Sequence, residues 1–146
     1  MGIYNYGLNF DALRGANIAR LPQFKDKHGN LAHSKLDGSD WSPAQWLQAF
    51  IGEVGEYANI RKKFERGDLS REEYEVLATK ELADIQTYLD LLALRALDKD
   101  DFIHPTGIDL GRATIQKFNE VSNRVGSNVR LDADDWHYTE VQDNGK

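Results

Sequence analysis

The fold of this chain is decided by residues 42–97, which read SPAQWLQAFIGEVGEYANIRKKFERGDLSREEYEVLATKELADIQTYLDLLALRAL. The segments SPAQ (42–45) and SREE (70–73) both have the pattern of a helix N-terminal capping box. One helix is therefore predicted from Ser42 to about Glu65, and another from Ser70 to about Leu97. Because the junction around Gly67 is short, the two helices should form an antiparallel hairpin.

Each predicted helix carries two acids spaced three residues apart, Glu53 with Glu56 and Glu81 with Asp84. On an α-helix, residues three apart lie on the same face. Glu56 lies 11 residues before Gly67 and Glu81 lies 14 residues after it. These intervals correspond to roughly 16 and 21 Å along a helix, so the two acid pairs should face each other.

Both acid pairs interrupt apolar helical stripes, so they are expected to border the core. Close carboxylates in such a place must be protonated or held by a cation. Neither pair has the histidine that di-iron carboxylate bundles use at the third position. Oxygen-only ligands favour Mg²⁺, with Mn²⁺ as a substitute. The alternative is that they are ordinary surface acids that form ion pairs with neighbouring lysines and arginines.

The rest of the chain predicts two more helices, Asn9–Arg20 and Ile108–Val125, and no strand. In the first of these, Asn17 and Arg20 are interpreted as surface or capping groups, and the alternative is contact with a nucleotide from the end of the helix. Residues 23–40 read as a long loop, in which His28 and His33 are expected to be exposed, and Trp41 after it is expected in the core. Gly52 and Gly55 favour either close helix packing or close approach of a metal or phosphate.

The composition excludes several classes of protein. The chain has 146 residues, a formal net charge of −6 and no cysteine. Its length predicts one domain, and its acidity argues against a nucleic-acid-binding protein. A thiol nucleophile and a disulfide framework are excluded, and no apolar run is long enough to predict a membrane span. A cytoplasmic location is expected, which would be the host cytoplasm for a phage-encoded protein.

Three motifs resemble a known family. They are Trp46-x6-Glu53-Val-Gly-Glu56, then Lys62-Lys63-x-x-Arg66-Gly67-Asp68, then Glu81-Leu-Ala-Asp84-Ile-x-x-Tyr88. They look like the MazG-like all-α nucleoside triphosphate pyrophosphatases, particularly the small single-domain kind of phages and prophages. The similarity runs from about residue 40 to 130. It implies a four- to five-helix bundle over residues 1–130, a C-terminal tail over 131–146, and assembly into a dimer or tetramer through helix packing between chains.

The resemblance also implies a reaction, the Mg²⁺-dependent cleavage of a nucleoside triphosphate to monophosphate and pyrophosphate, as a control on the nucleotide pool. The metal ligands and catalytic residues would be Glu53, Glu56, Glu81 and Asp84, with Glu53 orienting the water. The implied substrate-binding residues are Lys62, Lys63, Arg66, Tyr88, Lys117, Asn119, Asn123 and Arg124.

Two other functions are compatible with the same patterns. One is a non-catalytic helical oligomerisation module, and the other is a hydrolase of the dimeric all-α dUTPase type. A homo-oligomer is expected in every case, because both long helices carry apolar residues on more than one face. These additional apolar positions are Leu47, Ile51, Val54 and Ala58 in the first helix, and Leu82, Ile85, Leu89 and Leu92 in the second.

Overall fold

The computed structural model describes residues 8–35, 37–97, 107–132 and 139–140, which are mainly α-helical. The all-α prediction is therefore confirmed. The chain divides into two compact units, Met1–Ile108 and Asp109–Lys146, and each is described here by itself. The predicted division into a domain over 1–130 and a tail over 131–146 stays a prediction. No helix of the described part has both the length and the apolar character that a membrane span requires.

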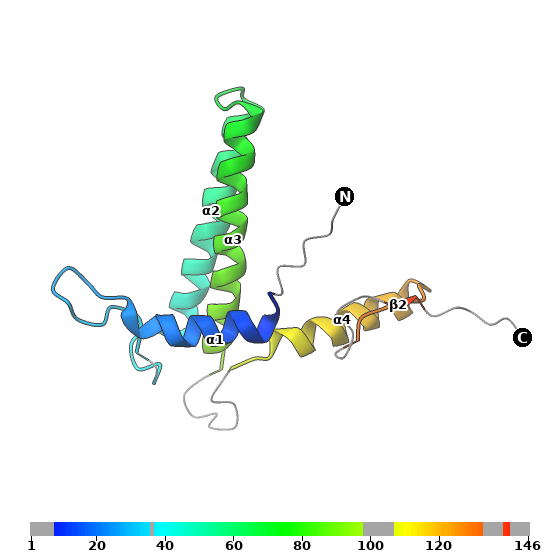
Figure 1. Cartoon of the computed structure of the whole chain (residues 1–146), viewed down its shortest axis with the longest axis horizontal. Coiled ribbons are helices and arrows are strands. Elements are labelled where there is room, and N and C mark those ends of the chain that lie inside the picture. The colour runs from blue at the N-terminus through cyan, green and yellow to red at the C-terminus, as the bar shows by residue number, and fades with distance from the viewer. Residues whose placement is uncertain (1–7, 36, 98–106, 133–138, 141–146) are drawn as a thin grey trace, which may run out of the picture. The chain divides into compact units, whose positions relative to one another are not determined.

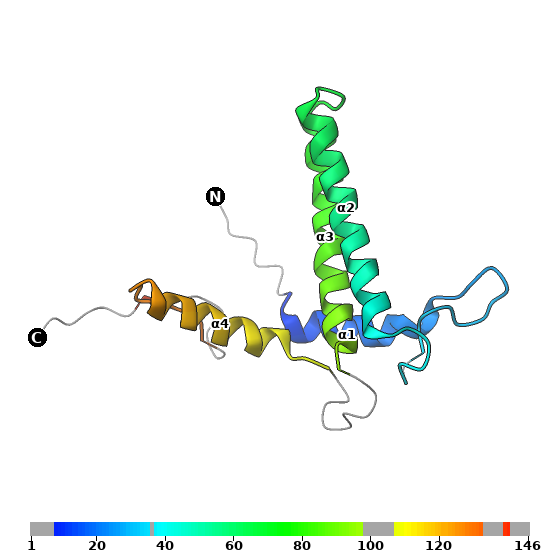
Figure 2. The same cartoon turned by 180° about the vertical axis from the view of Figure 1, so that it is seen from behind.

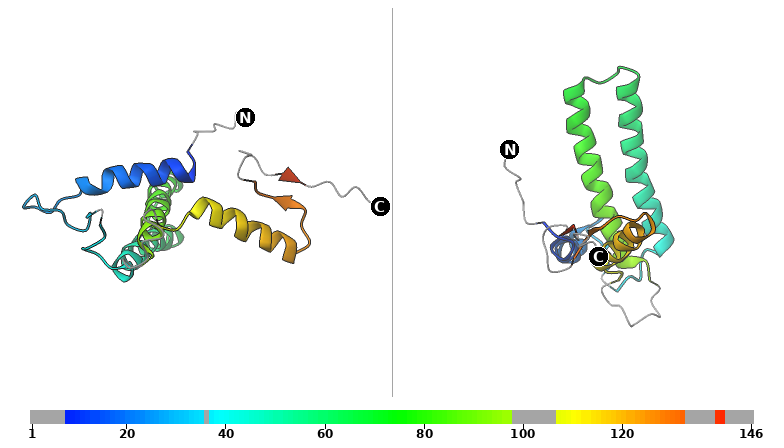
Figure 3. Two further views of the ribbon diagram at one scale, coloured as in Figure 1. Left: turned by 90° about the horizontal axis from the view of Figure 1, so that it is seen from below. Right: turned by 90° about the vertical axis from the view of Figure 1, so that its right-hand side faces the viewer.

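The first unit is built on a hairpin of two long helices, α2 (Pro43–Glu65) and α3 (Arg71–Arg95), which lie side by side and antiparallel (Figure 1; Figure 3, right). Both helices begin at the predicted capping boxes. In the first box, the Ser42 hydroxyl accepts a hydrogen bond from the Gln45 N–H, and the Gln45 side chain accepts one from the Ser42 N–H. The predicted central hairpin is thus confirmed, with Gly67 at a positive φ of 78° in the junction.

Helix α1 (Phe10–Arg20) crosses the open end of this hairpin, opposite the junction (Figures 1 and 2). A buried ion pair holds it against α3. The Asp90 carboxylate is 1% exposed and accepts hydrogen bonds from Arg14 Nε and Asn17 Nδ2, each at 2.9 Å. The expectation that Asn17 is a surface group is wrong, because its amide satisfies a carboxylate oxygen that burial has removed from water.

A small core fills the open end of the hairpin. Leu21, in the single 3-10 turn Leu21–Gln23 that follows α1, packs with Trp46 and Leu91. Trp41 packs against this cluster, as predicted. The His33 ring stacks on Trp41 with 4.4 Å between ring centroids and is half-buried, so the expectation of an exposed His33 is wrong. The loop lies against the core because its aromatic side chains supply part of the apolar surface there.

The second unit contains helix α4 (Leu110–Arg124) and two short antiparallel strands, β1 (Val129–Arg130) and β2 (Thr139–Glu140) (Figure 3, left). The sequence predicted no strand, because a two-residue strand is too short to show an alternating pattern. The Asn119 side chain joins α4 to the segment after β1. Its Nδ2 donates to the Leu131 carbonyl at 2.8 Å, and its Oδ1 accepts from the Leu131 N–H at 2.9 Å.

We predict that Asp90→Ala lowers the free energy of unfolding by about 3 kcal/mol, because it leaves Arg14 largely buried without its counter-ion. Urea unfolding followed by circular dichroism measures the change. The control is Glu75→Ala, which removes an exposed ion pair with Arg71 and should change stability by no more than about 0.5 kcal/mol. Equal effects of the two substitutions would contradict a structural role for the buried pair.

Candidate metal centre

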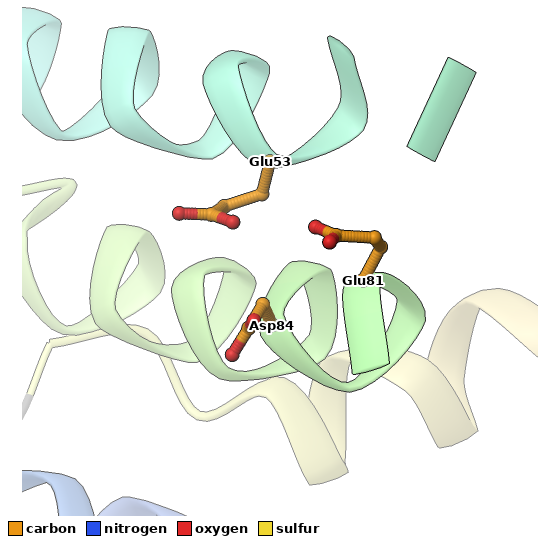
Figure 4. Close-up of side chains that lie close together, drawn as sticks. All are labelled: Glu53, Glu81 and Asp84. Carbon is orange, nitrogen blue, oxygen red and sulfur yellow. The ribbon is translucent and has the colours of Figure 1, made fainter. Parts of the chain in front are cut away.

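Three of the four predicted acids converge between α2 and α3. Glu53 reaches across from α2, and Glu81 and Asp84 come from successive turns of α3 (Figure 4). One carboxylate oxygen from each of the three lies within 4.8 Å of the other two. The hairpin register produces this cluster, because it places the middle of α2 opposite the middle of α3. Three of the four acids that the sequence predicted to meet, Glu53, Glu81 and Asp84, are therefore close together.

The fourth predicted acid, Glu56, is exposed and does not belong to the group of three. It nevertheless lies close enough to act on its neighbours. Burial raises the pKa of Glu53, and the negative charges of Glu56, Asp84 and Glu81 raise it further. Burial also raises the pKa of Glu81, reinforced by the charges of Glu56 and Asp84 and by a side-chain hydrogen bond with Glu56. Each raised pKa means that ionisation of the carboxylate costs free energy at this place between the two helices.

The donor set fits a hard divalent cation. All the converging atoms are carboxylate oxygens, which is the ligand type that Mg²⁺, Mn²⁺ and Ca²⁺ prefer. Glu81 Oε2 is shielded from solvent and has no hydrogen-bond partner among the described residues. A buried oxygen without a donor is unfavourable, and a cation between the helices would satisfy it.

The ion-pair alternative for these acids receives no support from the described residues. The ion pairs there involve other carboxylates, those of Glu65, Asp68, Glu75, Asp90 and Glu120. The three clustered acids therefore differ from Glu65 and Glu75, which are exposed acids of α2 and α3 that each pair with an arginine. No ion pair of the described residues offsets the repulsion among the carboxylates of Glu53, Glu81 and Asp84.

Tyr88 lies where the sequence placed it, at the edge of the acid cluster. It packs against the core cluster, and burial raises the pKa of its hydroxyl, as do the charges of Glu53 and Asp84. The positive charge of Arg20 acts on the same hydroxyl in the opposite direction. Arg20 is thus a cation near the site, whereas the sequence favoured a surface or capping role for it over contact with a nucleotide. Its position at the end of the predicted helix was the signal for the second interpretation.

The predicted basic residues of α2 lie further along the hairpin. Lys62, Lys63 and Arg66 follow Glu53 by 9, 10 and 13 residues, which corresponds to about 14, 15 and 20 Å along the helix axis. All three are exposed, and Arg66 pairs with Asp68 at 2.7 Å in the junction. The structure does not bring them to the acid cluster, and contact with substrate phosphates stays a prediction.

The other predicted substrate-binding residues, Lys117, Asn119, Asn123 and Arg124, belong to the second unit. Within that unit most of them already have partners. Lys117 pairs with Glu120 at 2.6 Å, and Asn123 Oδ1 accepts from Arg130 Nη2 at 2.6 Å. The Asn119 and Asn123 bonds hold the segment after α4 onto the helix, whereas the Lys117–Glu120 pair lies within α4. A role in binding a nucleotide stays a prediction.

Gly52 and Gly55 interrupt α2 beside the acid pair. A Cβ atom built on either glycine would meet no atom of the described residues within 4 Å, apart from the adjacent backbone of α2 itself. Close packing inside the chain therefore does not require either glycine. The two alternatives that remain are access for a ligand and contact with another molecule.

Comparisons of the chain with protein-family models, curated proteins and solved structures gave no match. The resemblance to the MazG-like family therefore rests on the three motifs, and the functional argument rests on the geometry of the acid cluster.

We expect the contribution of Glu53 and Glu81 to the stability of the metal-free protein to fall as the pH rises above about 4.3, because these two groups have raised pKa values only in the folded state. The folded protein binds these protons more tightly than the unfolded chain does. Their contribution thus favours folding at low pH and is lost as the pH passes the raised pKa. Glu53→Gln should be more stable than the parent at neutral pH and similar to it near pH 4.

Urea unfolding between pH 4 and pH 7.5, with a chelator present, measures this difference. Glu75→Gln is the matched control, because Glu75 is an exposed acid on α3 with an arginine partner. A stability difference between Glu53→Gln and the parent that stays constant over this pH range would contradict the electrostatic origin of the shifts.

We also expect Mg²⁺ or Mn²⁺ to raise the melting temperature in proportion to the logarithm of its concentration, because a cation held by the cluster binds only the folded form. At a concentration one hundred times the Kd, the gain in unfolding free energy is about 2.7 kcal/mol. Differential scanning calorimetry with and without a chelator measures it. The Asp84→Asn variant should lose most of the gain, and an unchanged parent curve would exclude a metal site.

Proposed function

We propose that the protein is a metal-dependent nucleoside triphosphate pyrophosphohydrolase that uses Mg²⁺, with Mn²⁺ as a substitute. The observation that carries the proposal is the convergence of Glu53 from α2 with Glu81 and Asp84 from α3. Carboxylates from two helices that lie this close together can bind a divalent cation, and the cation can in turn bind phosphate oxygens. The reaction type, cleavage to a monophosphate and pyrophosphate, comes from the resemblance of the three motifs to the MazG-like family.

The three clustered acids would hold the metal, and Glu56 would complete the set from the exposed side of the cluster. When bound, the metal would neutralise phosphate charge and acidify a nearby water. Tyr88 lies between the acids and the apolar core, where its ring can pack against the sugar or base. Arg20 beside it supplies a positive charge that attracts the anionic substrate.

In the proposed reaction, a water oxygen forms a bond to the α phosphorus, and the bond from that phosphorus to the bridging oxygen breaks. The bridging oxygen leaves with the electron pair as part of pyrophosphate, and a carboxylate accepts the proton of the water. Glu53 is the proposed acceptor, because it is half-buried and is the member of the three-acid group that α2 supplies, opposite the α3 pair.

The test is incubation with each common ribo- and deoxyribonucleoside triphosphate and Mg²⁺ in isotopically labelled water, followed by mass spectrometry of the products. Attack at the α phosphorus places the label in the monophosphate. Label in pyrophosphate or orthophosphate would contradict the proposed chemistry, and hydrolysis of dUTP alone would favour the dUTPase type.

We expect Glu53→Gln, Glu81→Gln and Asp84→Asn each to lower kcat/KM at least about 100-fold. Substitution of a residue that only supports a metal ligand typically lowers activity or metal affinity 10- to 100-fold. Substitution of a direct ligand should lower activity more. The control is Glu72→Gln, an exposed acid in the first turn of α3, which should leave kcat/KM unchanged. Parent-like activity in all three cluster variants would reject the assignment.

A further inference from the structure

A group of aromatic and polar side chains, the Tyr74 cluster, joins α2 to α3 between the acid cluster and the junction. Its members are Tyr57, Arg61 and Phe64 of α2 and Tyr74 of α3. The hydroxyl oxygens of Tyr57 and Tyr74 lie 3.3 Å apart, and Arg61 Nη1 donates to the Tyr74 hydroxyl oxygen at 3.5 Å. The Phe64 ring stacks on the Tyr74 ring with 4.4 Å between ring centroids. Tyr74 therefore contacts three side chains of the opposite helix.

The hydrogen bonds of this cluster converge on the Tyr74 oxygen. Hydrogen bonds from Tyr57 and from Arg61 lower the pKa of the Tyr74 hydroxyl, whereas the hydrogen bond with Tyr74 raises the pKa of the Tyr57 hydroxyl. These opposite directions identify Tyr57 as the donor and Tyr74 as the acceptor. The Arg61 guanidinium carbon also lies 5.6 Å from the centroid of the Tyr74 ring. The Tyr74 side chain is thus held both at its hydroxyl and at its ring.

Contacts of this kind resist sliding of one helix along the other. The burial of apolar surface has no preferred direction, so it opposes a small shift only weakly. A hydrogen bond weakens steeply when its angle departs from the optimum. Because a tyrosine side chain has only two torsion angles, a hydroxyl contact between two tyrosines restrains the backbones that carry them. The Tyr57–Tyr74 contact therefore restrains the position of α3 along α2.

The acid cluster needs such a restraint because the junction is far from it. Glu53 lies 14 residues before Gly67 and Glu81 lies 14 residues after it, which corresponds to about 21 Å along each helix. At that distance, a change of about 3° in the angle between the helices moves the carboxylates by about 1 Å. The groups of a binding site have to be held to within about 0.5 Å. Repulsion among the carboxylates also tends to separate the two helices.

Contacts between the two helices flank the acid cluster on both sides along the hairpin. Towards the open end, Trp46 of the core cluster lies seven residues before Glu53 on α2. Towards the junction, Tyr57 lies four residues after Glu53 on α2, and Tyr74 lies seven residues before Glu81 on α3. The acids therefore lie between an apolar contact and a hydrogen-bonded one, each within about 10 Å along the helix axis.

We propose that Tyr74 is a positioning residue of the metal centre, which holds α3 in place along α2 so that Glu81 stays opposite Glu53. The inference rests on the proposed metal site, and it assigns Tyr74 no part in the reaction. A contact that only stabilises the fold changes the fraction of folded molecules and leaves the metal affinity of the folded form unchanged. Loss of a positioning contact should instead weaken metal binding well below the melting temperature, where all molecules are folded.

Calorimetric titration with Mn²⁺ measures this effect. Tyr74→Phe removes the hydroxyl and keeps the ring that stacks on Phe64. Its Kd for Mn²⁺ should rise about 10-fold, as is typical when a residue that supports metal ligands is replaced. The control is Thr79→Val, because the Thr79 hydroxyl donates to the Glu75 carbonyl within α3. It should leave the Kd unchanged. Equal Kd values for the parent and Tyr74→Phe would overturn the proposal.

A double-mutant cycle tests whether the effect passes through the shared hydroxyl contact. Tyr57→Phe removes one donor and leaves Arg61 in contact with Tyr74, so the Kd should rise less than in Tyr74→Phe. The double variant should bind Mn²⁺ as Tyr74→Phe does, because the second substitution removes a contact that is already lost. Effects of the two substitutions that multiply independently would overturn a role through this contact.

Distances between spin labels measure the relative position of the helices in the metal-free protein. The chain has no cysteine, so Gln48→Cys and Gln86→Cys place one label on each helix at an exposed position. Tyr74→Phe should shift or broaden the distribution of label distances, and Thr79→Val should not. A distribution that Tyr74→Phe leaves unchanged would overturn the proposal.

The same measurements separate the positioning role from the proposed function. Circular dichroism of Tyr74→Phe verifies that the helices persist under the conditions of the titration. Failure of the parent to bind Mn²⁺ would count against the proposed function, and the spin-label distances would still decide whether Tyr74 holds the two helices in place. Binding by the parent together with an unchanged Kd in Tyr74→Phe would overturn the positioning role alone.

Discussion

The antiparallel register of α2 against α3 is the constraint on which the candidate site depends. Two capping boxes define where each helix begins, and the Gly67 junction defines how far the chain travels before it returns. With both ends fixed, Glu53 has to lie opposite Glu81. A shift of one residue in either helix would rotate its acids by about 100° and separate the carboxylates. The cluster is therefore a consequence of hairpin geometry as much as of residue type.

The protein deals with buried carboxylates in two different ways within α3. Asp90 is almost fully buried, and the side chains of Arg14 and Asn17 satisfy it, so it fastens α1 across the open end of the hairpin. Glu81, less than three turns earlier, has an oxygen that is shielded from solvent and has no donor among the described residues. The first arrangement is complete as it stands. The second has the properties of a site that is completed by a ligand.

Apolar residues, too, are buried in one part of the hairpin and exposed in another. The main core cluster of the first unit lies at the open end of the hairpin, where the 3-10 turn after α1 and the loop before α2 contribute Leu21 and Trp41. Towards the junction the hairpin is only two helices thick, and one of its sides stays apolar and uncovered within the unit. Two helices cannot bury all the apolar residues that they carry on several faces, so the remainder favours association with another molecule.

The sequence by itself predicted the hairpin and, within a set of four acids, the three that meet in it. Capping boxes and helical periodicity are local properties, and a short junction leaves one way for two helices to pair. Only the tertiary structure decided that Asn17 is buried against Asp90, that His33 stacks on Trp41, and that Asn119 holds the segment after β1. Each of these contacts joins segments whose relative position depends on how α1, the loop or α4 packs, and a polar residue looks the same in the sequence whether its partner is water or a distant side chain.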